Sequence, residues 1–172
     1  MKTITFLPKA WARIMVVLGS IAMLVGALDP LEGSIVILIG SALMALGTGL
    51  GQGERRLINY RILVFLLIAV GVGALWVLSA SGGLGGASGH NPWWGVLILP
   101  YLIGWLMGIW GPGNPRWFLA LAIMVGLWFL ALGGLVLSHP SRDSSVGVVI
   151  SLAALGLVTI GGCIVRLQNR HS

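Results

Sequence analysis

The sequence predicts an all-α integral membrane protein, with one transmembrane domain over residues 1–172 built as a bundle of six helices. The first observation is composition, since 58% of the 172 residues are apolar and only 8% are charged. Soluble domains carry about 25% charged residues, so a mean hydropathy of +1.03 excludes that class. The second observation is the length of the apolar runs, because about 20 apolar residues cross a bilayer.

Six runs approach or reach that length, and they cover residues 10–28, 34–50, 62–80, 93–111, 117–138 and 145–165. The first is long enough only if Arg13 lies near its end, where the side chain can reach the interface. It also resembles a signal peptide, with Lys2 and Lys9 before it and Val25-Gly26-Ala27 as a cleavage-like site. Because the next run follows after a short turn, an uncleaved first helix is favoured.

The basic residues predict the orientation. With six spans, both termini and the second and fourth loops share one side, and nine of the ten lysines and arginines fall there. The other side holds Arg142 and three of the four acidic residues. Cytoplasmic loops are enriched in Lys and Arg, so both termini are expected in the cytoplasm, with the chain in a bacterial inner membrane. The pI of about 10.8 then reflects topology, and no nucleic-acid partner is expected.

Three of these cations, Arg55, Arg56 and Arg61, lie in the second loop close to the start of the third run. Each basic residue near an anionic lipid surface contributes about 1 kcal/mol of attraction. We therefore expect these three residues to contact lipid headgroups.

Glycine spacing predicts how the helices pack. Gly19 and Gly26, Gly40 and Gly47, and Gly126 and Gly133 are each seven residues apart, and Gly104 and Gly108 are four apart. These spacings place each pair on one helix face, and small-residue faces let membrane helices approach closely. Most should pack within the bundle. The remaining faces could serve a homo-oligomer or a larger membrane complex.

A weak internal repeat suggests that the first and last hairpins are copies of one unit. The segment LMALG (43–47) recurs as LAALG (152–156), and Gly19 and Gly26 are spaced like Gly126 and Gly133. Pro30 and Pro140 fall in the two outer turns. The bundle is thus expected to contain repeated helical hairpins.

Residues that could carry chemistry are scarce. No Asp, Glu, Lys, Arg or His lies deep within the six runs, whereas ion-coupled carriers and proton channels keep such residues in the membrane. No serine has a nearby His and acid on its helix face, so no catalytic residue is expected. Cys163 is the one cysteine, which excludes an intrachain disulfide, and no metal site is expected.

The two remaining candidates are sites for an apolar cofactor, a pigment or a lipid. His90 and His139 both fall on the outer side and could be axial ligands for a haem or chlorophyll, although two solvated loop histidines are favoured. Tyr101 follows Pro100, which predicts a kink in the fourth helix. Tyr101 and Trp128 are expected near mid-bilayer, where they could line a cavity; a packing role is favoured. The cofactor's identity stays unknown.

The segment VLGSIAMLVGALDPLEGSIVILIGSALMALGTG, echoed at 126–162, resembles the repeated hairpins of the HdeD-like family of small multi-pass bacterial membrane proteins. The resemblance implies about six helices and a role in envelope or acid stress, and it carries over no site residue. NPWWGVLILPY and WGPGNPRW in the middle third do not match the pattern.

Together these observations predict a non-enzymatic protein, a structural or accessory subunit that packs in a membrane complex or homo-oligomer. The alternatives are a passive channel or transporter formed by an oligomer, a binder of an apolar cofactor, pigment or lipid, and an HdeD-like stress protein.

Overall fold

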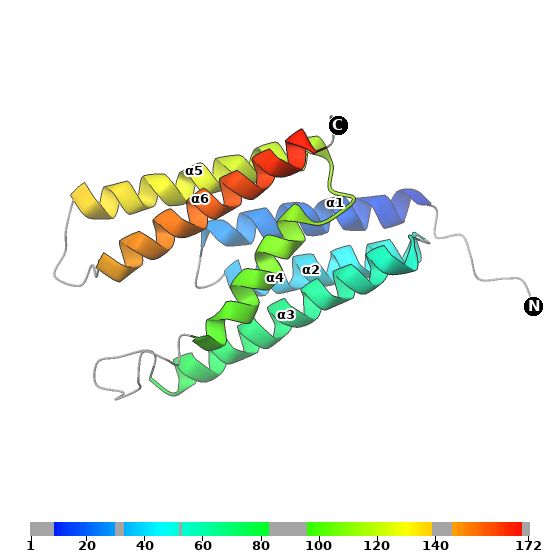
Figure 1. Ribbon diagram of the computed structural model, residues 1–172. Helices are drawn as coiled ribbons and strands as arrows, with labels where there is room; N and C mark the ends of the chain where they lie inside the picture. The colour runs from blue at the N-terminus through cyan, green and yellow to red at the C-terminus, as the bar shows by residue number, and fades with distance from the viewer. Residues whose placement is uncertain (1–8, 30–32, 52, 83–95, 139–145, 170–172) are drawn as a thin grey trace, which may run out of the picture. The chain divides into compact units, whose positions relative to one another are not determined.

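The computed structural model describes residues 9–29, 33–51, 53–82, 96–138 and 146–169, which form six α-helices and no strand. The helices are α1 (Lys9–Val25), α2 (Gly33–Leu50), α3 (Arg55–Ala80), α4 (Leu99–Trp110), α5 (Arg116–Ser138) and α6 (Val146–Gln168), as Figure 1 shows. A short 3₁₀ helix, Gly26–Leu28, continues α1. The all-helical class and the six helices are confirmed.

Five of the six helices are long and apolar enough to cross a membrane. Among the described residues the fourth, with its preceding 3₁₀ turn, covers Val96–Trp110; the expected span was 93–111. Residues 93–95 lie outside the described residues.

Pro100, where a kink was expected, is the second residue of α4, directly after the 3₁₀ turn at 96–98. In the first turn of a helix the backbone N–H groups have no helical acceptor, so proline costs nothing there. Tyr101 therefore lies in the first turn of α4 and not at its centre.

The start of α3 differs from its predicted place. The apolar run begins at residue 62, but the helix begins at Arg55, since the arginines and leucine before the run are themselves good helix formers. Arg55, Arg56 and Arg61 thus belong to α3. Arg61, six residues after the start of α3, is buried, with 5% of its surface exposed.

The chain divides into two compact units, Met1–Gly108 and Ile109–Ser172, and the division falls within α4. In the first unit, α1 and α2 form an antiparallel hairpin whose seam repeats every seven residues. A Cβ added to Gly47 would lie 2.8 Å from the carbonyl oxygen of Ala12, and one added to Gly40 would lie 2.7 Å from that of Gly19. At the end of the hairpin where α1 leads into α2, Gly26 lies against Gly33. Main chain therefore meets main chain along the whole hairpin.

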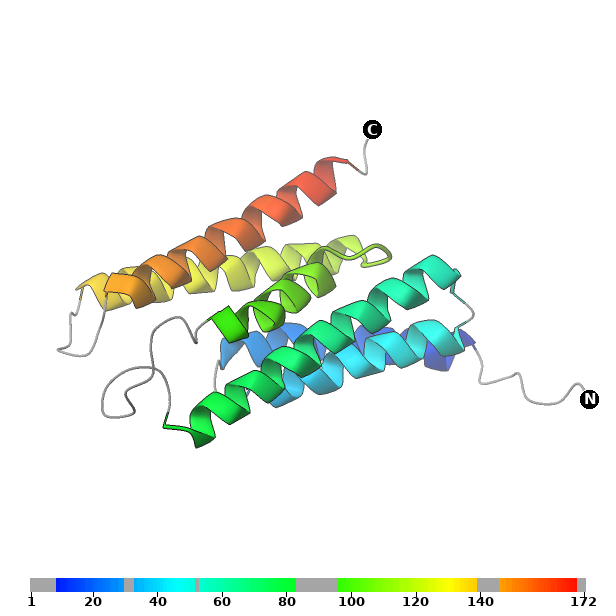
Figure 2. The ribbon, with the colours of Figure 1, turned by 60° about the horizontal axis from the view of Figure 1, so that its bottom comes forward.

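In the same unit α3 lies beside α2, as Figures 1 and 2 both show, and α4 packs antiparallel on α3. Gly71 of α3 lies against the main chain of Tyr101. Gly104 faces Leu67 and Ile68, each 2.9 Å from the position of its missing Cβ. Small residues thus set the close approach of α4 as well.

The second unit contains the end of α4, a turn, and the antiparallel pair α5 and α6. The helices touch most closely at Gly126 and Gly156: a Cβ on Gly156 would lie 2.7 Å from the carbonyl oxygen of Gly126. Seven residues further along α5, Gly133 has looser contacts, since its Cβ would meet nothing nearer than 3.7 Å. Among the residues described for this hairpin, Gly126 and Gly156 form its one close crossing.

The described helices have an apolar surface as well as an apolar core. Large apolar side chains are exposed on every helix, among them Val70 at 62%, Met124 at 64% and Leu157 at 62%. Ser20, Ser41 and Thr159 are buried, each at 1% exposure or less. Apolar side chains outside and hydroxyls inside suit helices that face lipid.

Candidate functional site

The polar side chains buried in each unit are the natural candidates for a site. In the first unit two of them join helices. Trp105 of α4, 2% exposed, donates its Nε1–H to the carbonyl oxygen of Met23 in α1 at 3.0 Å. Tyr60 of α3 donates its hydroxyl to the carbonyl oxygen of Met107 at 2.6 Å. These bonds hold α4 to α1 and to α3.

Arg61 follows Tyr60 on α3 and is the one charged side chain among the buried residues that the structure describes. It lies on the same face as Val64 and Ile68, which are also buried. Its neighbours Arg55 and Arg56 are exposed. The three arginines expected to contact headgroups therefore have different surroundings, and a buried guanidinium is costly enough that it is usually retained for a purpose.

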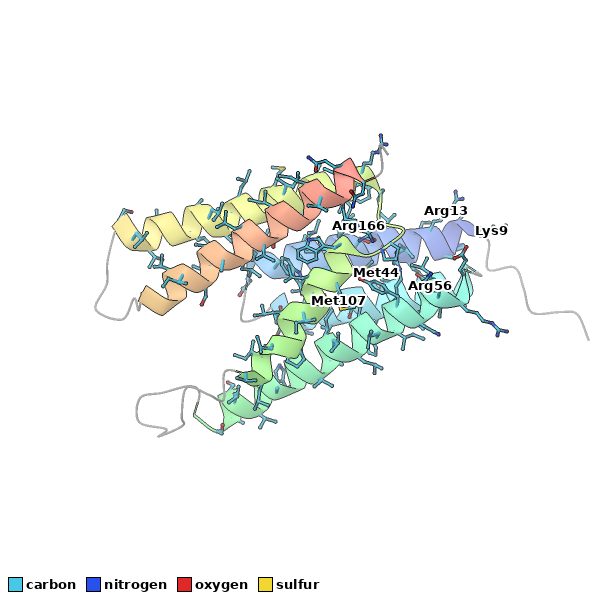
Figure 3. All side chains as sticks on the ribbon, in the orientation of Figure 1. Lys9, Arg13, Met44, Arg56, Met107 and Arg166 are labelled. Atoms are coloured by element: carbon cyan, nitrogen blue, oxygen red, sulfur yellow. The ribbon has the colours of Figure 1, made fainter. Side chains whose placement is uncertain are left out.

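In the second unit the polar contacts gather where α4 ends. Arg166 of α6, labelled in Figure 3, donates its Nε–H to the carbonyl oxygen of Trp110 at 2.7 Å. Asn114, in the turn after α4 and 1% exposed, donates to the carbonyl oxygen of Ile109 at 2.9 Å. The indole ring of Trp110 lies against Gly162, one turn before Arg166.

These contacts share one physical cause. The last four carbonyls of a helix have no helical N–H to accept, and in α4 they belong to Met107, Gly108, Ile109 and Trp110. Three of the four accept a side-chain donor, from Tyr60, Asn114 and Arg166. Side chains therefore cap three of the four carbonyls at the C-terminal end of this short apolar helix. The positive charge of Arg166 also suits the negative end of the helix dipole.

The buried hydroxyls also bond to main chain, each to the preceding turn of its own helix. Ser20 donates to Val16 at 2.7 Å, Thr48 to Met44 at 2.7 Å and Thr159 to Leu155 at 2.7 Å. Such bonds satisfy a hydroxyl inside a membrane helix without a second helix. The hydroxyls of these three residues are therefore used in hydrogen bonds within their own helices.

Two of the four predicted cofactor residues lie within the described residues, one in each unit. Tyr101 is half-buried and packs its main chain on Gly71 in the first unit. Trp128 of α5, in the second unit, is 47% exposed. His90 and His139 lie outside the described residues. Within the described residues, no group of three or more His, Cys, Asp or Glu could hold a metal ion, and Cys163 is buried and free.

The glycines expected at helix contacts are found as follows. Gly19, Gly26, Gly40 and Gly47 lie on the α1–α2 seam, and Gly126 lies at the α5–α6 crossing. Gly133 has only ordinary contacts, and Gly104 and Gly108 receive side chains of neighbouring helices. A Cβ on Gly108 would meet the methyl group of Met23. Each of these glycines therefore lies at a helix–helix contact within its own unit.

Sequence reasoning did not single out Tyr60, Trp105, Asn114 or Arg166 as contact residues. One signal was present: a polar residue close to an apolar run needs a partner once it is buried. The identity of that partner, a carbonyl of another helix, depends on tertiary structure. Comparisons with protein families, with curated proteins and with solved structures found no match to the chain.

Proposed function

We propose that the chain is an integral membrane protein with a non-enzymatic role, a structural or accessory subunit that packs in a homo-oligomer or a larger membrane complex. One observation carries this proposal: the buried polar side chains with known partners donate to main-chain carbonyls. Trp105, Tyr60 and Arg166 join helices in this way. The buried hydroxyls donate to carbonyls of the preceding turn in their own helices. Groups used in this way hold a scaffold together.

The proposed orientation places both termini in the cytoplasm of a bacterial inner membrane. In the first unit Lys9, Arg13 and Arg56 lie toward one end, where α1 and α3 begin (Figure 3). Asp29 follows α1 at the other end of the α1–α2 hairpin. This distribution supports the positive-inside interpretation. The resemblance to HdeD-like hairpins agrees with a small multi-pass protein of the bacterial envelope.

Topology can be tested with cysteines at the two ends of α3. Glu54 and Ser81 flank this helix and are exposed. In a Cys163→Ala background, a membrane-impermeant maleimide should label Ser81→Cys in intact cells and label Glu54→Cys only after the inner face is opened. Labelling of both sites in intact cells would refute the orientation. Extraction of the protein by alkaline carbonate would refute membrane integration.

The accessory role is tested by native mass spectrometry after gentle solubilisation. We expect either several copies of the chain or a reproducible stoichiometric partner. A bare monomer at every detergent concentration that preserves helicity would contradict the proposal. A bound chromophore, seen by absorbance, would instead favour the cofactor alternative at Tyr101, Trp128, His90 or His139.

A second candidate is a passive anion pathway formed by an oligomer, and Arg61 favours it. Its guanidinium is buried in α3, within one of the five apolar spans, and ionisable residues in such places often line ion paths. Anion flux into liposomes reconstituted with the wild type should then fall on Arg61→Gln and persist in the exposed control Arg55→Gln. Absence of flux in the wild type would remove this candidate.

A further inference from the structure

We draw no further inference here: the strongest candidate, the exposed face of α5 and α6 around the open glycines Gly134 and Gly161, carries nothing because nothing in the structure shows what covers it.

Discussion

Glycines bring main chain against main chain in both the α1–α2 and the α5–α6 hairpin, but at more positions in α1–α2. In α1–α2, main-chain contacts recur at Gly47, Gly40 and Gly33, one every seven residues. In α5–α6 the only glycine pair in such contact among the described residues is Gly126 with Gly156. A seven-residue repeat keeps a seam aligned along two helices, whereas a single close point lets them diverge. The first hairpin should therefore be the more rigid.

The same contacts bear on the internal repeat. Gly19 and Gly126 correspond in the sequence, and their partners are Gly40 and Gly156. Aligning LMALG with LAALG instead makes Gly156 correspond to Gly47, and Gly47 contacts Ala12. The two sequence matches imply registers one heptad apart, so they do not describe one common hairpin. Common descent of the two hairpins stays a prediction. It is compatible with the glycine spacing or with the LMALG and LAALG match, but not with both.

The largest expected effect is at the centre of the α1–α2 seam. Gly40→Ala places a Cβ 2.7 Å from the carbonyl oxygen of Gly19 and 3.0 Å from the Cβ of Ala22. Overpacking of this kind costs about 1–3 kcal/mol, and the loss can be measured by unfolding in SDS, followed by tryptophan fluorescence. Gly49→Ala on the same helix is the control, since its Cβ would meet nothing within 4 Å. Equal losses would show that the seam is not the cause.

The two hairpins differ most clearly near the segments that connect their helices. In Gly26→Ala the Cβ would lie 2.6 Å from the carbonyl oxygen of Gly33, whereas in Gly133→Ala the nearest atom is 3.7 Å away. We expect a loss of about 1–3 kcal/mol for Gly26→Ala and a change within about 0.5 kcal/mol for Gly133→Ala. Gly134→Ala, next in the chain and open, should behave like Gly133→Ala. A similar penalty at Gly26 and Gly133 would show that α5–α6 is as tight as α1–α2.

The hydrogen bonds to α4 and α1 carbonyls should have intermediate effects. Trp105→Phe removes the donor to Met23, and Arg166→Gln removes the Nε donor to Trp110. Hydrogen bonds between membrane helices contribute about 0.6 kcal/mol on average, so each change should cost about 1 kcal/mol or less. Hydrogen exchange would locate the loss: protection should fall around Met23 in the first variant and at the end of α4 in the second. Arg116→Gln, an exposed arginine, controls for lost charge. If it matched Arg166→Gln, the carbonyl contact would be irrelevant.

Hydropathy predicted much of this fold because it reports a property that each helix has by itself. Five of the six runs became long apolar helices, and glycine spacing identified the faces of α1 and α2 that meet. The start of α3 was not predicted, since a hydropathy window stops at Arg61, whereas the C-terminal ends of α3 and α4 were predicted to within one residue. Helix propensity continues α3 back to Arg55, and side chains from other helices allow α4 to end at Trp110. The caps Tyr60 and Arg166 depend on which helices become neighbours, and that information is not local.

The smallest expected effect is at the glycines that face open space. A Cβ on Gly73 of α3 or Gly161 of α6 would meet nothing within 4 Å. Alanine is the better helix former, by about 0.5–1 kcal/mol at an exposed position, so both substitutions should leave stability unchanged or raise it slightly. In an oligomer the outcome at the two sites could differ, because a face buried against another chain would resist the added methyl group. SDS unfolding and native mass spectrometry of Gly161→Ala should therefore be compared with those of Gly73→Ala. Loss of the oligomer in Gly161→Ala alone would place the contact on α6, whereas identical behaviour at both sites would leave these two faces to lipid.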